Sequence, residues 1–308
     1  MSKDKKIFAT PKVRKFAREL GANISLIEGS ERKGRITEED VKNFVNEKLN
    51  QSKNINQNSR ESKKIESEFN HSDFGEVEVK DIPRVKKIAA PHLVNSWTRI
   101  PHVTHHDEAD VTELEQFRTS LTDIDTGKLK KITPLVFIIK SLVLALKKYQ
   151  NFNSSIDDIE NGKITLKKYF HIGIAVDTEH GLMVPKIRNA NEKNINQLSE
   201  ELRDISEKCR KLKIDKKEFF GGSITITSLG GIGGSFFTPI INHPEVAILG
   251  IGRTYYKQVL IDNSFQKRVM LPLSLSYDHR IIDGAEAARF CNEIKDSLGK
   301  NFAYKLAI

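Results

Sequence analysis

A polar stretch at residues 49–75 divides this chain into two folding units. The part from Asn50 to Ser59 contains almost no apolar residues. Because such a segment cannot bury enough surface to offset the entropy lost on ordering, we predict a flexible linker. It separates a small unit at residues 7–48 from a large unit at residues 76–308, and 308 residues are enough for about two domains.

The small unit carries the signals of two short helices. Thr10 followed by Pro11 is typical of a helix N-terminus, and Gly21 is typical of a helix end. Thr37 can cap a second helix with its side-chain oxygen. The acidic residues after it also suit the positive end of the helix dipole. With so few apolar residues, the unit lies near the lower size limit for a domain that folds alone. Apolar residues recur at helical spacing in both segments: Val13, Phe16, Ala17, Leu20, Val41, Phe44 and Val45.

The large unit mixes helices with strands. We predict a buried helix from Thr133 to Leu146, and two strands within residues 171–188 that turn at Glu179-His180-Gly181. Further runs rich in β-branched residues predict strands at residues 223–229, 246–251 and 269–276. This order predicts an α/β sandwich, in which helices cover one mixed sheet.

A further helix of the large unit is amphipathic. Its apolar residues follow a 3-4-3-4-3 spacing: Ile195, Leu198, Leu202, Ile205, Cys209 and Leu212. We therefore expect Cys209 to be a core residue rather than a nucleophile. With Cys291 as the only other cysteine, a disulfide scaffold is excluded and a reducing compartment is favoured. No apolar run reaches the ~18 residues of a membrane span, and no signal-peptide stretch follows the first residues, so we predict a cytoplasmic protein without a membrane partner.

The net charge of +9 raises the question of nucleic-acid binding. However, 50 basic residues are interspersed with 41 acidic ones along most of the chain. The sequence has neither an aromatic–basic ribonucleoprotein signature nor zinc-finger spacing. We expect no nucleic-acid partner and no metal.

One stretch after the last predicted strand holds residues suited to proton transfer. It reads Ser276-Tyr277-Asp278-His279-Arg280-Ile281-Ile282-Asp283-Gly284. A histidine can act as a general base when its pKa lies near the working pH and its orientation is fixed. From the spacing alone, a surface turn with an ordinary ion pair is the favoured interpretation.

A second stretch could supply a hydrogen-bond donor to the same chemistry. Between Thr225 and Gly234, hydroxyl residues at a strand end precede a glycine-rich turn, where backbone can approach a ligand closely. The glycines match neither phosphate-binding fingerprint, because no Lys-Ser/Thr follows them and no helical pattern opens there. A purely structural hairpin is the alternative.

Taken together, these segments resemble the dihydrolipoyl acyltransferases, the core enzymes of the 2-oxo acid dehydrogenase complexes. The resemblance covers most of residues 82 to 300, in order and with matching spacing. It implies a chloramphenicol-acetyltransferase-like sandwich, in homotrimers that assemble into a larger core. The matching segments are Asn153 to Ser155, Gly173 to Asp177, Gly181 to Pro185, Thr225 to Gly234, Phe237 to Asn242, Pro244 to Gly250 and Leu273 to Gly284.

Residues 8–46 resemble the small helical peripheral subunit-binding domain of the same family. The resemblance implies docking of dihydrolipoyl dehydrogenase, of the 2-oxo acid dehydrogenase, or of both, through Arg14, Arg18 and Arg35. Arg14 and Arg18 are four residues apart on one helix face, as a docking patch requires, although a solvated helix face gives the same pattern. Glu31 departs from the family, which has a second glycine in this loop.

The resemblance implies that an acyl group moves from a dihydrolipoyl arm to coenzyme A, which is a substrate. His279 would be the general base for the attacking thiol. Thr227 would donate a hydrogen bond to the oxyanion, with Ser228 as the competing hydroxyl. Asp283 would hold the turn or the histidine itself. In the family this site is formed between two subunits, so His279 would face Thr227 of a neighbour.

The resemblance assigns the acyl group as acetyl, in the pyruvate complex. Ile100 to Thr104 and Asp110 to Glu115 look like the acetyl-transferring enzymes, whereas Thr227 is more frequent in the succinyl-transferring relatives. Succinyl or branched-chain acyl transfer in a sister complex is the alternative.

Lys186 is a further departure, since the family usually has an aliphatic residue there; it either faces solvent or alters the adjacent site.

The chain shows no Asp-Lys-Ala, the lipoyl-attachment pattern of the family. We therefore expect the lipoyl group to come from another chain or from a missing domain. This leaves a second hypothesis, a non-catalytic scaffold that docks the dehydrogenases, although such scaffolds lose the histidine that His279 represents. A chloramphenicol-type acetyltransferase for small molecules is a third, which the appended binding domain disfavours.

Overall fold

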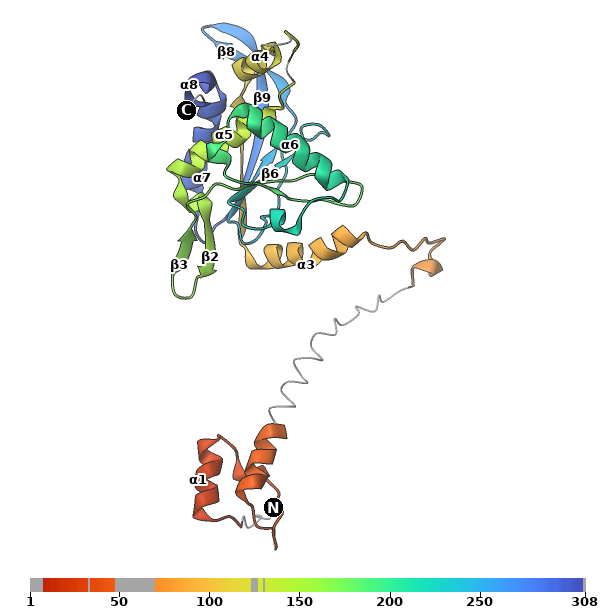
Figure 1. Ribbon diagram of the computed structural model, residues 1–308, viewed down its shortest axis with the longest axis vertical. Coiled ribbons are helices and arrows are strands. Elements are labelled where there is room, and N and C mark those ends of the chain that lie inside the picture. The colour runs from red at the N-terminus through yellow and green to blue at the C-terminus, as the bar shows by residue number, and fades with distance from the viewer. Residues whose placement is uncertain (1–7, 33, 48–69, 123–126, 130, 307–308) are drawn as a thin grey trace. The chain divides into compact units, whose positions relative to one another are not determined.

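The computed structural model describes residues 8–32, 34–47, 70–122, 127–129 and 131–306. The chain divides into two compact units, Met1–Val79 and Lys80–Ile308 (Figure 1). The linker predicted at residues 49–75 falls mostly outside the described residues.

The small unit is built from the two predicted helices. Helix α1 (Pro11–Glu19) begins after Thr10, whose side-chain oxygen accepts a hydrogen bond of 3.3 Å from the Val13 amide. The second helix covers residues 38–47, and Thr37 Oγ1 accepts the Asp40 amide at 3.2 Å. Both predictions are therefore confirmed, except that Leu20 is exposed because α1 ends before it. The buried core consists of Val13, Ala17, Ile27, Ile36 and Val41.

The loop between these helices depends on glycine at position 29. A Cβ atom on Gly29 would collide with the backbone of Arg35. Glu31 donates its amide to the Arg35 carbonyl at 3.2 Å, and it does not adopt a left-handed conformation. The missing second glycine therefore imposes no backbone strain on this loop.

The large unit is organised around one mixed sheet, as predicted. Its strands lie in the order β1-β9-β7-β6-β4-β5, and β8 pairs with the first half of β9. Strand β6 is parallel to both β4 and β7, whereas β9 is antiparallel to β7 and β1. The strands are β1 (His102–Asp110), β4 (Ile172–Ile174), β5 (Lys186–Ile187), β6 (Ile224–Ser228), β7 (Ala247–Ile251), β8 (Tyr255–Ile261) and β9 (Ser264–Asp278). A separate hairpin joins β2 (Ser154–Asp158) to β3 (Lys163–Leu166).

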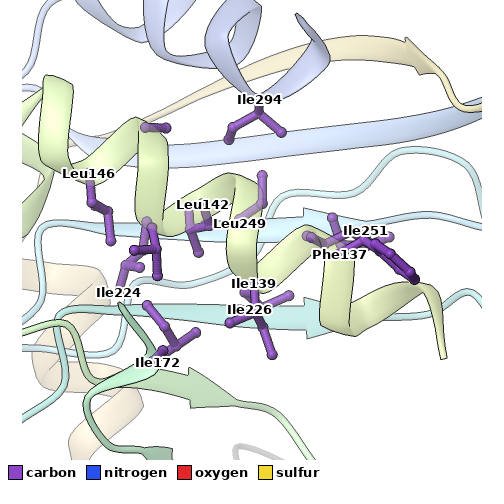
Figure 2. Packing of buried hydrophobic residues seen from close by; sticks show 14 of the residues in the cluster. Phe137, Ile139, Leu142, Leu146, Ile172, Ile224, Ile226, Leu249, Ile251 and Ile294 are labelled. Atoms are coloured by element: carbon purple, nitrogen blue, oxygen red, sulfur yellow. The ribbon is translucent and has the colours of Figure 1, made fainter. Parts of the chain in front are cut away.

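Helices bury their apolar faces against this sheet in one core. Figure 2 shows Ile139 and Leu142 of α5 against Ile226 and Leu249 of the sheet. Helices α6 and α7 contribute to the same core. The helices of the large unit are α3 (Arg84–Arg99), α4 (Thr112–Ser120), α5 (Pro134–Lys148), α6 (Ile195–Arg210), α7 (Gly284–Leu298) and α8 (Phe302–Leu306). Among the helices of the described ranges, none is long and apolar enough to cross a bilayer.

Most predicted elements of the large unit are confirmed. Thr133 caps α5, and Cys209 is fully buried in the core. The strands within residues 171–188 pair as a hairpin, with the Gly181 amide donating to the Thr178 carbonyl at the turn. The prediction that Leu212 lies on the apolar face of α6 is wrong. The helix ends at Arg210, and Leu212 has a left-handed φ of 54° and an exposed side chain.

Asp40 makes the stability of the small unit depend on pH. Burial alone would raise its pKa, but hydrogen bonds that the Thr37 and Ser30 amides donate to its carboxylate lower that pKa to about 2. Since the folded-state pKa is lowered, this contribution is present above about pH 4 and is lost as pH falls toward about 2. In the full chain, we expect hydrogen-exchange protection of residues 38–47, corrected for the intrinsic rate, to decline over that range. Asp40→Asn cannot titrate and should show a much flatter decline; an equally steep one would contradict this role.

Candidate active site

His279 occupies an exposed turn whose backbone is fixed. It follows directly on β9, where the last nine residues are buried or half-buried, and its own side chain is exposed. The His279 amide donates a hydrogen bond of 3.1 Å to the Pro101 carbonyl. Its ring centroid lies 5.9 Å from that of Tyr277. The imidazole is therefore accessible to a substrate while its main chain is tied to the sheet.

One ion pair, between the two residues that flank His279, stiffens the turn. Asp278 is 1% exposed, and its carboxylate accepts two hydrogen bonds from the Arg280 guanidinium, at 2.6 and 2.9 Å. This hydrogen bonding to Asp278 raises the pKa of Arg280. The Asp278 carbonyl also accepts the Ile281 and Ile282 amides. This pair was not predicted from the sequence, although Asp and Arg two residues apart around a histidine are a visible signal for it.

Asp283 holds the helix that follows the turn. It is the N-cap of α7, and its side chain accepts the Glu286 amide at 2.7 Å. Among the described residues, no hydrogen bond joins Asp283 to His279. In this arrangement Asp283 orders the chain after His279 rather than orienting the imidazole directly.

Thr227 lies near the end of β6, on the sheet face that α5 does not cover. Ile224 and Ile226 face α5 (Figure 2), so the alternation of a strand points Thr225 and Thr227 to the other face. Thr227 is half-buried, and its side chain makes no hydrogen bond with any described residue. Ser228, the competing hydroxyl, points to the opposite face from Thr227, and its Oγ accepts the Gly230 amide at 3.4 Å.

The structure does not bring Thr227 and His279 together within one copy of the chain. Thr227 is paired with Gly250, and Gly250 with Ser274, so Thr227 lies two strands away from β9. His279 lies five residues beyond Ser274, in the direction of the opposite end of the sheet. At ~4.8 Å per strand and ~3.4 Å per residue, the two Cα atoms are about 20 Å apart.

Lys186 does not face solvent, so that alternative is wrong. Its side chain is 1% exposed, and its ammonium lies 2.6 Å from a carboxylate oxygen of Glu245, which is also buried. Thr225 donates its hydroxyl to the same carboxylate at 2.6 Å. This buried cluster lies on the same face of the sheet as Thr227. Sequence spacing could not reveal it, because Lys186 and Glu245 are 59 positions apart.

A cavity of about 440 Å³ opens at the end of the sheet where Thr227 lies, but on the helix-covered side. It is bounded by α6, by the start of α5 and by the residues after β4. Lys131, Arg203 and Arg210 line it and are chemically suited to phosphate groups. Within the described ranges, no cluster of three or more His, Cys, Asp or Glu side chains could hold a metal ion.

The three arginines predicted to dock a partner are all exposed. Arg14 and Arg18 lie on α1, and Arg18 Nε donates to the Arg14 carbonyl at 3.3 Å. Arg35 follows Gly34, whose positive φ of 72° turns the loop. All three arginines belong to the small unit, whereas His279 belongs to the large one.

Both units match protein families. Residues 74–304 match "2-oxoacid dehydrogenases acyltransferase (catalytic domain)", and residues 7–42 match "e3 binding domain". The dihydrolipoyllysine-residue acetyltransferase component of the pyruvate dehydrogenase complex of Cupriavidus necator is 47% identical over 290 residues, which are 92% of this chain and 52% of the relative. The component of the same name from Haemophilus influenzae is 42% identical, with the same coverage. The chain spans about half the length of these curated relatives.

Solved structures confirm the predicted fold. The cubic core of the pyruvate dehydrogenase multienzyme complex matches with a TM-score of 0.74 and 43% identity, over 77% of this chain and 97% of that chain. A structure of Azotobacter vinelandii dihydrolipoamide acetyltransferase matches with a TM-score of 0.73, the same identity and the same coverage. It addresses the catalytic role of a serine, a histidine and an asparagine. The serine lies 52 positions before the histidine, and the asparagine lies four positions after it. Thr227 and Asp283 stand at these same distances from His279.

Asp283 should contribute to stability through its hydrogen bond rather than through its charge. Asp283→Ala removes the N-cap of α7 and should lower the free energy of unfolding of the large unit by about 1 kcal/mol, measured by urea denaturation. Asp283→Asn keeps a side-chain oxygen for the Glu286 amide and should stay within a few tenths of a kcal/mol of the unmodified chain. Equal losses in both variants would show that the charge matters more than the cap.

Proposed function

This chain belongs to the 2-oxoacid dehydrogenase acyltransferase family, and we propose that it transfers an acetyl group between a dihydrolipoyl group and coenzyme A in a pyruvate dehydrogenase complex. The observation that carries the proposal is the geometry at His279. Its imidazole is exposed, while its backbone amide and the ion pair beside it fix the turn. A general base for a thiol must be accessible to the substrate, and a fixed turn holds its Cα at one place beside it.

In the proposed reaction His279 takes the proton from the thiol of coenzyme A. The sulfur then attacks the carbonyl carbon of the acetyl-dihydrolipoyl thioester, and a tetrahedral intermediate with a negative oxygen forms. When the bond to the dihydrolipoyl sulfur breaks, His279 returns the proton to that sulfur, so the base is regenerated. Thr227 donates its hydroxyl to the negative oxygen, and such a donor is worth ~10²–10³ in rate.

The proposed site contains residues of two copies of the chain. Thr227 and His279 of one copy are about 20 Å apart, too far for both to contact one reacting carbonyl. A closed ring of three copies can repeat one shared site at each interface. The similarity to a cubic core structure supports further assembly of such homotrimers.

The acetyl group is supported by the relatives. Those described above are acetyltransferase components of pyruvate dehydrogenase complexes, at 42–47% identity over 92% of this chain. Thr227 stands where the Azotobacter protein has serine, and the substitution retains the hydroxyl that the mechanism needs. The scaffold alternative is disfavoured because His279 is present. The succinyl alternative has no support from the relatives described above, which are acetyltransferase components.

We further propose that the small unit docks dihydrolipoyl dehydrogenase, with or without the 2-oxo acid dehydrogenase. The match of residues 7–42 to the e3 binding domain supports this role. Arg14, Arg18 and Arg35 would supply the positive charge of the docking surface. The two cysteines are buried free thiols, which supports a reducing compartment such as the cytoplasm.

Mixing two inactive variants tests the shared site. His279→Ala should lose acetyl transfer between acetyl-coenzyme A and free dihydrolipoamide by orders of magnitude, and Thr227→Ala should lower kcat by ~10²-fold. When equal amounts of the two variants are assembled together, about a quarter of the interfaces combine an intact histidine with an intact threonine, so about a quarter of the activity should return.

The matched control mixes His279→Ala with the double variant His279→Ala/Thr227→Ala, which has no intact histidine and should give no recovery. Absence of recovery in the first mixture, with assembly intact by mass measurement, would place both residues' roles within one copy and contradict the shared site.

Charge reversal tests the docking surface. Arg14→Glu together with Arg18→Glu should weaken capture of dihydrolipoyl dehydrogenase by tenfold or more in surface plasmon resonance, with a smaller dependence on salt. Lys15→Glu is the control, since Lys15 lies on the same helix and forms an ion pair with Glu19. Acetyl transfer to free dihydrolipoamide should be unchanged in all of these variants. Equal weakening by Lys15→Glu would indicate nonspecific attraction.

A further inference from the structure

Lys186 is a buried cation that the proposed reaction does not use. It lies on the edge strand β5 and is 1% exposed, and its ammonium contacts Glu245, which is 3% exposed. Charged side chains are almost never buried to this extent unless they are paired. The side-chain amide of Asn242 is a second donor to the same carboxylate oxygen of Glu245, with its Nδ2 at 3.1 Å.

Two glycines provide the space for this pair. Lys186 pairs with Gly173 of β4, and Gly173 with Thr225 of β6, so the three residues form one row across the sheet. Because Gly173 has no side chain, the lysine reaches over it: a Cβ atom there would lie 2.7 Å from the ammonium and 2.5 Å from Thr225 Oγ1. A Cβ atom on Gly222 would collide with the Glu245 carboxylate.

The pair holds strand β6 through Thr225. The Thr225 hydroxyl donates to one Glu245 oxygen at 2.6 Å, and the Lys186 ammonium lies 2.6 Å from the other oxygen and 3.4 Å from Thr225 Oγ1. A β-branched side chain has few χ1 rotamers, so fixing this hydroxyl also fixes the strand around it. Thr227 is the next residue on the same face, ~7 Å farther along the strand.

Thr227 has no polar contact of its own to position it. Its hydroxyl makes no hydrogen bond with any residue that the structure describes, and the Phe237 ring occupies the space over Gly250, its partner on β7. The direction of its hydroxyl therefore depends on packing and on the backbone of β6. On the same face of β6, the residue before it, Thr225, does hydrogen-bond through its side chain, to Glu245.

We propose that Lys186 is a positioning residue for Thr227, acting through Glu245 and Thr225. Replacing a buried ion pair with apolar residues is frequently neutral or stabilising, so such a pair is weak evidence for a stabilising role alone. Here it fixes the strand that presents the oxyanion donor. The inference rests on the proposed role of Thr227 and adds a specific constraint on it.

A double-mutant cycle with Thr227 tests the coupling. In the assembled full chain, with acetyl-coenzyme A and free dihydrolipoamide, Lys186→Met should lower kcat by about tenfold and leave the KM for acetyl-coenzyme A unchanged, since small misplacements of a reacting group cost up to ~10² in rate. Thr227→Ala should cost ~10²-fold in the unmodified chain but only about tenfold in the Lys186→Met background.

The control is Lys140→Met, which removes a half-buried lysine of α5 on the other side of the sheet. It should leave kcat and the Thr227→Ala effect unchanged. If Thr227→Ala costs the same factor in the presence and absence of Lys186, the positioning role is overturned and the proposed function stands. If Thr227→Ala has no effect in the unmodified chain, the oxyanion assignment fails, and the inference with it.

A charge-neutral variant separates positioning from stability. Lys186→Met leaves Glu245 as an unpaired buried carboxylate and can impair folding, whereas Lys186→Met with Glu245→Gln removes both charges. We expect this double variant to regain the Tm of the unmodified chain while its kcat remains about tenfold lower. Normal kcat in a variant of normal Tm would overturn the inference.

Discussion

The direction of strand β9 determines how this molecule can work. Strand β6 runs parallel to β7, and β9 runs antiparallel to β7, so their carboxyl ends lie at opposite ends of one sheet. Thr227 is near the end of β6, and His279 follows the end of β9. A rigid, hydrogen-bonded sheet cannot bring these two groups together. The proposed acyl transfer therefore requires residues of a second copy of the chain, which would make oligomerisation part of the proposed active site.

Each half of the proposed site has its own ion pair with a buried carboxylate. At one end, Asp278 and Arg280 fix the turn that exposes His279. At the other end, Lys186 and Glu245 hold Thr225 on the strand that carries Thr227. Both carboxylates are almost completely buried, so neither could be left without its cation at low cost. Since the two halves meet only on assembly, each must be ordered beforehand within its own copy, and local charge pairs can provide that order.

Local signals in the sequence predicted much of this architecture, and long-range contacts account for what was missed. Thr10 and Thr133 each cap the helix predicted from them, because a cap is a contact within a few residues. Strand β1 was not predicted: as an edge strand with only Ala109 fully buried, it lacks an apolar alternation. The burial of Lys186 could not be predicted either, because its partner lies 59 positions away and the space comes from Gly173 and Gly222.

The most direct test of the shared site is a cryo-electron microscopy structure of the assembled chain with coenzyme A bound. We expect the thiol to lie ~3–3.5 Å from the His279 imidazole of one copy, with the Thr227 hydroxyl of a neighbouring copy directed at the position of the reacting carbonyl oxygen. A thiol beside His279 with no threonine hydroxyl from another copy within reach would contradict it.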